Sequence, residues 1–151
     1  MSRLEPSSRA DYPVLRPLQV RWEDIDIYGH VNNVVYLSYF DTAVNGWYVE
    51  QGILEMGASP HVFLVAETGA QYFREIRFGE TVRCGMRVER LGRSSVTYDL
   101  ALFTDTDKEG DEASAPLSCA RGRYVHVLVD EATRRPAPIE GAARAKLEGL
   151  T

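Results

Sequence analysis

The sequence predicts an α+β fold in which an antiparallel β-sheet wraps around one long central α-helix. Between residues 34 and 48 the apolar residues recur every three or four positions, the spacing of a helix with a wide apolar surface. Later segments alternate apolar and polar residues, as strands with one buried face do. The sequence contains no βαβ repeat and no glycine-rich phosphate loop. A sheet curled around the helix is therefore the economical packing.

Length and composition indicate a single globular domain that spans residues 1–151. The chain has 151 residues, of which 44% are hydrophobic and 26% are charged. That length supports one ordinary core and is too short for two. Residues 1–14 are polar and include Pro6 and Pro13, so we expect them to form a loose N-terminal arm.

The charge pattern and the absence of long apolar runs narrow the class of protein. The net charge is -5, and no basic cluster is longer than a pair, which disfavours nucleic-acid binding. No apolar run approaches the length that spans a bilayer, and the first residues lack the hydrophobic core of a signal peptide. We therefore expect a soluble, cytoplasmic protein with no nucleic-acid or membrane partner.

Cysteine and histidine spacings predict neither disulfides nor a metal site. Cys84 and Cys119 lie far apart in strand-like segments. The three histidines, His30, His61 and His126, lack the spacing of metal ligands. We expect no metal and no other cofactor. His61 should have no special role, and His126 should be a strand residue with a hydrogen-bonded ring.

The first elements follow from local patterns. Leu18, Val20 and Trp22 alternate with polar residues and predict a first strand. The central helix follows, and a glycine-containing connection over residues 51–60 comes after it.

Four further strands are expected, at residues 61–73, 82–89, 96–102 and 119–129. Gly69 suggests a bulge or a close backbone approach in the first of them. A turn around Gly92 joins the second and third strands, and an acidic loop over residues 104–116 joins the last two. A short amphipathic helix over residues 139–148 is expected near the end.

A polar turn precedes the central helix, and chemistry is expected there. Asn32 or Asn33 can cap the helix by accepting an amide hydrogen of its first turn, and Gly29 permits unusual backbone angles. Asp26 could supply a carboxylate to attack a carbonyl, or to activate water beside it, while helix-start amides polarise that carbonyl. His30 could position the same group or share a proton. The plain alternative is that these residues only cap the helix.

A specific motif runs through this turn into the helix. The run D-I-D-I-Y-G-H-V-N-N-V-V-Y-L-S-Y-F, which starts at Asp24, resembles the signature of the hotdog-fold thioesterase superfamily. It is similar to the branch of 4-hydroxybenzoyl-CoA thioesterases and acyl-acyl-carrier-protein thioesterases, which carry D-x-D-x-x-G-H-V-N-N-x-x-Y or a close variant there. Weaker similarity continues through F-R-E-I-R-F-G-E-T-V and R-L-G-R-S-S-V, so the resemblance covers most of the chain.

The resemblance implies the hotdog fold and hydrolysis of an acyl-CoA thioester, with coenzyme A as part of the substrate. In the hydroxybenzoyl-CoA enzymes the second aspartate of the motif, which falls on Asp26, is the catalytic carboxylate. In the plant-type acyl-carrier-protein enzymes the pattern is D-x-N-x-H, and its asparagine falls on Tyr28. That departure disfavours an asparagine-dependent mechanism and leaves Asp26 and His30 in place. Family members pair through sheet edges, with active sites at the dimer interface, so a homodimer or homotetramer is expected.

Beyond Asp26 and His30, the residues expected to bind substrate are Gly29, Val31, Asn32, Asn33, Tyr36, Glu67, Arg93, Ser94 and Ser95. Tyr36 and Tyr39 would line the acyl tunnel, with core packing as the alternative. Glu67 would add a second carboxylate from the partner subunit, or be an ordinary exposed charge. Residues 93–95 would contact the CoA phosphates through amides and a guanidinium, or form a plain hairpin turn.

Other functions remain open to the same fold. The thioester carrier could be acyl-carrier protein instead of CoA. A non-catalytic acyl-thioester binder would not need a carboxylate beside the carbonyl, so the intact Asp26 argues against it. A hydratase or dehydratase would often place its acid on the central helix, where Asp41 is the main acid and is expected on the polar side. Thioester hydrolysis is therefore favoured, and the pocket walls, which set the acyl chain, are not specified by the sequence.

Overall fold

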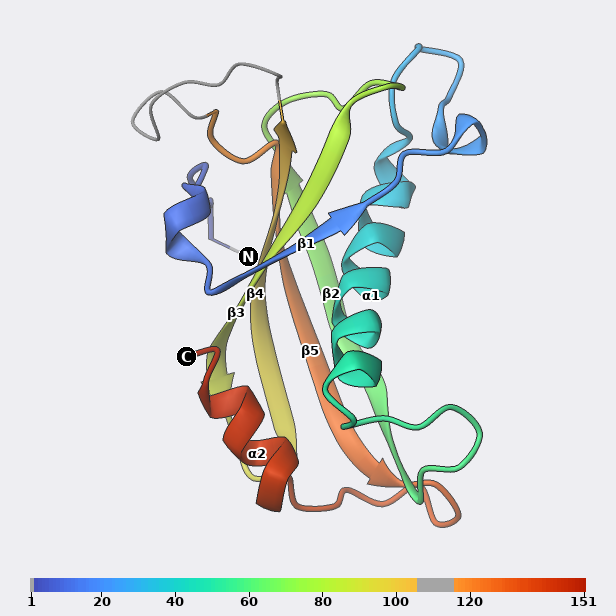
Figure 1. Cartoon of the computed structure of the whole chain (residues 1–151), viewed down its shortest axis with the longest axis vertical. Coiled ribbons are helices and arrows are strands. Elements are labelled where there is room, and N and C mark those ends of the chain that lie inside the picture. The colour runs from blue at the N-terminus through green and yellow to red at the C-terminus, as the bar shows by residue number, and fades with distance from the viewer. Residues whose placement is uncertain (1, 106–115) are drawn as a thin grey trace.

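The computed structural model describes residues 2–105 and 116–151 (Figure 1). The main elements are β1 (Val14–Leu18), α1 (Asn33–Glu50), β2 (His61–Tyr72), β3 (Thr81–Leu91), β4 (Ser95–Asp105), β5 (Ala120–Asp130) and α2 (Gly141–Glu148). Two short 3₁₀ turns, Arg9–Asp11 and Trp22–Asp24, flank β1. The predicted loop over residues 104–116 falls mostly outside the described residues. The order of one strand, a long helix and four further strands is as predicted.

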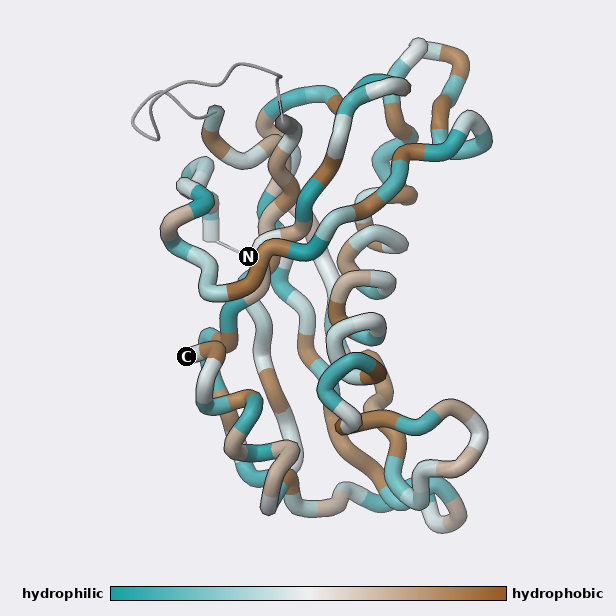
Figure 2. Tube along the Cα trace, viewed as in Figure 1, coloured by the Kyte–Doolittle hydropathy of each residue, from teal (hydrophilic) through white to brown (hydrophobic). Residues whose placement is uncertain are grey.

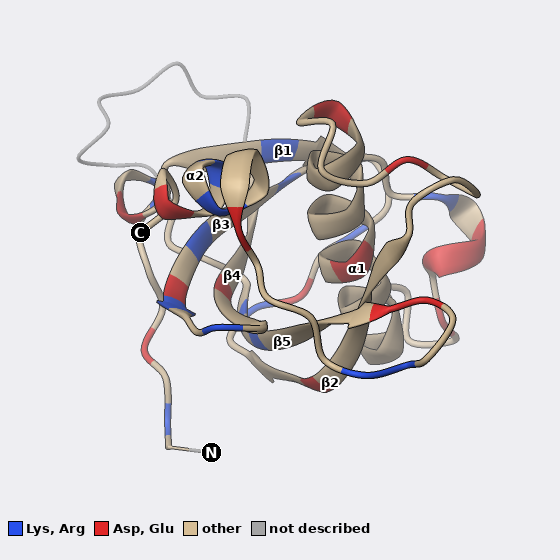
Figure 3. Cartoon of the chain, turned by 90° about the horizontal axis from the view of Figure 1, so that it is seen from below, with Lys and Arg blue, Asp and Glu red and all other residues tan. Residues whose placement is uncertain are grey.

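The strands form one antiparallel sheet that curls around α1 (Figure 3). Its strand order is β1-β3-β4-β5-β2, so β1 and β2 are the two edges. β3, β4 and β5 form the centre of the sheet as consecutive antiparallel neighbours. β2 pairs with β5 along its whole length, from His61 to Tyr72. A curled sheet around one long helix is the hotdog arrangement, which confirms the predicted fold class.

The helix α1 begins where the sequence supplies a cap. The side chain of Asn32 accepts the Val34 amide at 3.0 Å, and the helix then runs for 18 residues. Its buried side chains are Tyr36, Tyr39, Phe40, Ala43, Val44, Trp47 and Tyr48. These recur at the predicted spacing of three and four, and Figure 2 shows apolar positions along both α1 and the strands beside it. The helix is therefore the centre of the core.

A small polar cluster lies inside that core. The Tyr48 hydroxyl is 2.7 Å from the Tyr98 hydroxyl and 2.9 Å from Nδ1 of His126. The His126 side chain is buried, and burial lowers its pKa to about 4. His126 is therefore a neutral ring with a hydrogen-bond partner, as the sequence predicted.

The other face of the sheet is covered in part by the N-terminal segment. Tyr12 packs on Phe103, with ring centroids 5.8 Å apart, in an apolar cluster separate from the one around α1. Ser7 is also buried and bonds to Ser118 through its amide at 2.9 Å. The residues that follow α2 are bonded to β3, because the Val88 amide donates to the Leu150 carbonyl at 2.8 Å.

Two local predictions are wrong. The first strand is Val14–Leu18, and Trp22 lies instead in a 3₁₀ turn and is 75% exposed. The bulge predicted at Gly69 is misplaced, because the irregularity in β2 falls between Val65 and Glu67 and Gly69 pairs in regular register. The alternative of a close backbone approach at Gly69 stays a prediction. Within residues 2–105 and 116–151, no helix is long and apolar enough to cross a membrane.

Candidate active site

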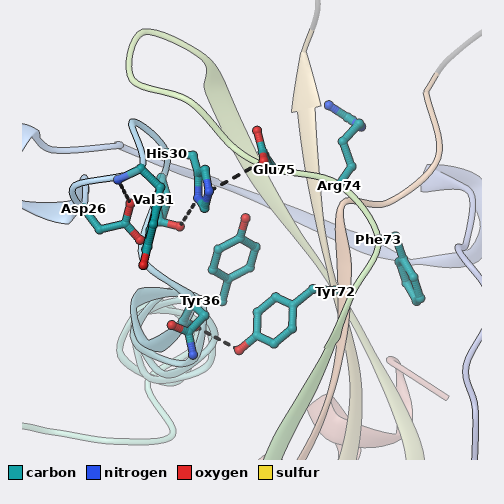
Figure 4. Close-up of a pocket in the computed structure, with 10 residues that line it drawn as sticks. Asp26, His30, Val31, Tyr36, Tyr72, Phe73, Arg74 and Glu75 are labelled. Atoms are coloured by element: carbon teal, nitrogen blue, oxygen red, sulfur yellow. Dashed lines mark hydrogen bonds and ion pairs between the residues drawn. The ribbon is translucent and has the colours of Figure 1, made fainter.

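An open pocket of about 460 Å³ lies at the N-terminal end of α1 (Figure 4). One side is the turn that precedes the helix, and the other is the end of β2 with the segment that follows it. The lining residues are Asp26, Tyr28, His30, Val31, Asn33, Tyr36, Tyr72, Phe73, Arg74 and Glu75. Five of these were predicted from the sequence as site residues.

The turn itself fixes the carboxylate of Asp26. Oδ1 of Asp26 accepts the Tyr28 amide at 2.9 Å, a local turn that short acidic side chains favour. The Asp26 carbonyl accepts the Gly29 amide at 3.1 Å, and Gly29 has φ of 83°, a conformation that costs glycine little. Oδ2 of Asp26 lies 3.5 Å from Nδ2 of Asn32. One carboxylate oxygen therefore belongs to the turn, and the other faces the helix start.

Most backbone amides of the predicted region are already used inside the protein. The amides of Gly29, Val31 and Asn32 donate to the carbonyls of Asp26, Ile76 and Asp24, at 3.1, 2.8 and 2.9 Å. The Val34 and Val35 amides donate to Asn32, to its side-chain oxygen and its carbonyl. The predicted capping role of Asn32 is confirmed, and fewer amides are available to a ligand than the sequence suggested.

His30 lies in the pocket wall between two oxygen acceptors. Its Nδ1 is 3.3 Å from the Val31 carbonyl oxygen, and its Nε2 is 3.6 Å from Oε1 of Glu75. The ring also stacks on Tyr28 at a centroid distance of 6.3 Å. The His30 side chain is 26% exposed, so it remains open to a ligand in the pocket.

Two tyrosines form the apolar wall of the pocket. The rings of Tyr36 and Tyr72 meet edge to face with centroids 5.0 Å apart. The Tyr36 hydroxyl accepts the Ile76 amide at 3.2 Å, and the Tyr72 hydroxyl donates to the Asn33 carbonyl at 2.9 Å. Burial raises the pKa of Tyr36 to about 12, which keeps its hydroxyl neutral. Tyr36 therefore both packs in the core and lines the pocket, whereas Tyr39 is turned to Asp24.

Asp24 is buried beneath the turn and does not line the pocket. Its carboxylate is 1% exposed and accepts the Arg21 amide at 2.8 Å and the Tyr39 hydroxyl at 2.8 Å. Burial alone would raise its pKa, but these hydrogen bonds and the Arg21 guanidinium outweigh burial and lower the pKa of Asp24. The first aspartate of the motif is therefore a structural anion that holds the start of the turn.

The remaining predicted residues lie outside this pocket within one chain. Glu67 is on β2 with its carboxylate 3.8 Å from Nε of Arg123. Residues 93–95 lie at the turn between β3 and β4, where Ser95 pairs with Val127. The pocket is near the opposite end of β4, where Leu102 pairs with Ala120, which in turn pairs with Tyr72 at the end of β2. The Arg93 carbonyl accepts the Ile139 amide at 2.7 Å. The substrate contacts predicted for Glu67, from a partner subunit, and for residues 93–95, with the CoA phosphates, stay predictions.

The sequence reasoning missed the side of the pocket contributed by residues 72–75. Their signal was present in F-R-E-I-R-F, which carries the weaker part of the resemblance. These residues reach the helix start because the Val31 amide bonds to the Ile76 carbonyl, a contact between segments 45 positions apart. Among the described residues, no three histidine, cysteine or acidic side chains are grouped so as to hold a metal ion.

Comparison with known proteins agrees with this geometry. The sequence profile of the thioesterase-like superfamily matches residues 20–147. The chain belongs to the thioesterase-like superfamily. That match includes the whole turn, α1 and all strands except β1. No curated protein sequence matches the chain significantly.

Several solved structures are similar to the chain. The PA5185 protein of Pseudomonas aeruginosa strain PAO1 is 40% identical, with a TM-score of 0.88 over 97% of both chains. A thioesterase from Thermus thermophilus, solved with coenzyme A and Zn, is 33% identical, with a TM-score of 0.71 over 93% of this chain and 95% of that one. A 1,4-dihydroxy-2-naphthoyl-CoA thioesterase from Synechocystis is 17% identical, covers 90% and 96% of the two chains with a TM-score of 0.75, and shows the fold alone.

Proposed function

We propose that the protein is an acyl-CoA thioesterase, which converts an acyl-CoA and water into a free acid and CoA. The observation that carries the proposal is that Asp26 and the start of α1 line the same pocket. The chain that holds this pocket belongs to the thioesterase-like superfamily. Val31, Tyr36 and Tyr72 give that pocket an apolar side suited to an acyl group. The Thermus thermophilus thioesterase solved with coenzyme A supports CoA as the carrier.

Asp26 acts on the thioester carbonyl by one of two routes. In the first, a water oxygen bonds to the carbonyl carbon while its proton passes to Asp26. The carbon–sulfur bond then breaks, and the proton passes to the leaving sulfur. In the second, the carboxylate itself bonds to the carbonyl carbon, the thiolate leaves, and water cleaves the resulting anhydride. Both routes need the same carboxylate at the same place.

The amide of Asn33 and the side chain of His30 are proposed to face the carbonyl oxygen or the sulfur. The amides of Gly29, Val31 and Asn32 are bonded to protein carbonyls, whereas Asn33 lines the pocket at the positive end of α1. His30 lines the same pocket within reach of a ligand. A donor aimed at the developing charge is the usual electrostatic part of acyl transfer.

Thiol release from short, medium, long and aromatic acyl-CoAs tests this function. We expect Asp26→Asn to lower hydrolysis of the preferred substrate at least ~100-fold, the scale of a positioned acid or base. The fold should survive, because the asparagine oxygen can still accept the Tyr28 amide. His30→Ala should cause a smaller loss. Glu23→Gln is the matched control, since its carboxylate is 70% exposed and does not line the pocket.

Near-normal turnover by Asp26→Asn would refute the assignment. If no acyl-CoA is cleaved by folded protein, acyl-carrier-protein thioesters are the next substrates to test. Failure with those as well would favour a non-catalytic thioester binder, for which equilibrium binding of an acyl-CoA is the direct measurement.

We further propose a homodimer or homotetramer that uses the β2 edge. β2 is an edge strand of the sheet, and its residues Leu64 and Val65 are 41% and 47% exposed. An exposed apolar edge strand invites pairing with a second copy. Sedimentation equilibrium should report at least a dimer at micromolar concentration, and a monomer would contradict the proposal.

A further inference from the structure

Glu75 makes two side-chain contacts at the pocket, and one of them is to a proposed site residue. Its Oε1 lies 3.6 Å from Nε2 of His30, as Figure 4 shows. Its Oε2 accepts a hydrogen bond from Nη2 of Arg77 at 2.9 Å. Glu75 therefore has one oxygen on the histidine ring and the other on a guanidinium that restrains the carboxylate.

The backbone on both sides of Glu75 is anchored. The Arg74 amide donates to the Cys119 carbonyl at 3.0 Å. On the other side, Ile76 is fully buried, its amide donates to the Tyr36 hydroxyl at 3.2 Å, and its carbonyl accepts the Val31 amide at 2.8 Å. The Glu75 side chain is thus presented to the pocket from a fixed segment, although it follows the end of a strand.

The stability of the fold does not account for this placement. The Glu75 side chain is 52% exposed and the Arg77 side chain is 63% exposed. Ion pairs at such exposure contribute little to stability, because solvent screens the charges and two flexible side chains must be held. The contact with His30 has a different consequence, since the other ring nitrogen lies 3.3 Å from the Val31 carbonyl oxygen. An imidazole N–H can donate to either oxygen, so the two oxygens favour this orientation of the ring over the flipped one.

We propose that Glu75 is a positioning residue for His30 in thioester hydrolysis. It holds the imidazole beside the Val31 carbonyl, in the wall of the pocket where Asp26 also lies. This inference rests on the proposed function, in which His30 contacts the thioester. Fixing such a group in advance lowers the cost of orienting it during the reaction.

Kinetics of Glu75→Gln test the proposal. We expect kcat to fall roughly tenfold with KM changed less than about twofold, because a misplaced ring weakens transition-state contacts more than ground-state binding. The loss should vanish in a His30→Ala background, since residues that act through one another are not additive. Glu80→Gln is the matched control: its carboxylate lies on the same segment, near the Arg77 amide at 3.4 Å, and does not line the pocket. Equal losses with and without His30 would overturn the proposal.

A spectroscopic measurement separates this proposal from the proposed function. Long-range ¹H–¹⁵N spectra of the full chain resolve the ring nitrogens of its three histidines. Glu75→Gln should shift the His30 ring nitrogens and leave those of His61 and His126 in place. If His30 does not shift, Glu75 does not hold the ring, whatever the enzyme cleaves. If His30 shifts in a protein that cleaves no thioester, the contact stands and the proposed function fails.

Discussion

The side-chain nitrogen of Asn32 lies 3.5 Å from Oδ2 of Asp26, while the oxygen of the same side chain accepts the Val34 amide at 3.0 Å. One asparagine thus begins α1 and also faces the proposed carboxylate. The capping interpretation and the catalytic interpretation of this turn are therefore compatible. Variants that keep one contact and remove the other can separate the two roles.

Asn32→Ser is expected to keep the cap and lose the contact with Asp26. Serine and asparagine cap helices about equally well, so the free energy of unfolding should change by less than about 0.5 kcal/mol. Hydrolysis should fall by roughly three- to tenfold, because Asp26 loses a neighbouring donor that restrains it. Asn32→Ala removes both contacts and should also cost about 1 kcal/mol of stability. Urea unfolding and thiol release measure the two effects, and a wild-type rate in Asn32→Ser would show that capping is the whole role.

Asp24→Asn should destabilise the fold in a pH-dependent way. The pKa of Asp24 is lowered because hydrogen bonds from Arg21 and Tyr39 outweigh burial, so the ionised form stabilises the folded state. That contribution is fully present above the ordinary aspartate pKa near ~4 and is lost as pH falls through the lower value of the folded state. We expect a loss of about 2 kcal/mol at pH 7 and a smaller loss near pH 3. Urea unfolding at both pH values is the measurement, with the exposed Glu23→Gln as control.

Much of the fold could be predicted because its signals are local. The spacing of Tyr36, Phe40 and Trp47 is set by one helical turn after another, and all three are buried. The cap at Asn32 and the turn at Gly29 depend on residues within three positions. Alternation likewise located the central strands, because each has one face on the same core.

The errors arise where long-range contacts decide. Val14 pairs with Met86, so β1 starts before the apolar alternation that suggested a later strand. Pro17 is accommodated there because β1 is an edge strand, where proline is tolerated. Glu75 was missed for a similar reason, because its approach to His30 depends on contacts of Ile76 with Val31 and Tyr36.

The buried His126 should make stability depend on pH in a higher window than Asp24 does. Burial lowers its pKa to about 4, against an ordinary value near ~6.5, so only the unfolded chain takes up this proton between those values. The free energy of unfolding should therefore fall by about 2 kcal/mol from pH 7.5 to pH 5. His126→Gln should flatten this dependence, whereas the exposed His61→Gln should retain it. Urea unfolding at the two pH values would contradict the assignment if His126→Gln kept the wild-type slope.

Two glycine variants should rank in opposite order for their losses of stability and of activity. A β-carbon at Gly122 would lie 2.4 Å from Cε2 of the buried Phe40, so the ring must move within a packed core, and Gly122→Ala should cost about 1–3 kcal/mol. A β-carbon at Gly29 meets no atom within 4 Å, and the φ of 83° alone should cost about 1 kcal/mol.

The loss of activity should be larger in the variant that loses less stability. Gly29 donates its amide to the Asp26 carbonyl, so a shifted backbone there moves the proposed carboxylate directly. Gly29→Ala should therefore lose more of its rate per folded molecule than Gly122→Ala, although it unfolds at higher urea. Thiol release at 25 °C, normalised to the folded fraction from urea unfolding, measures both quantities on the same samples. A greater loss of rate in Gly122→Ala would mean that packing beneath Phe40, and not the turn around Asp26, controls the pocket.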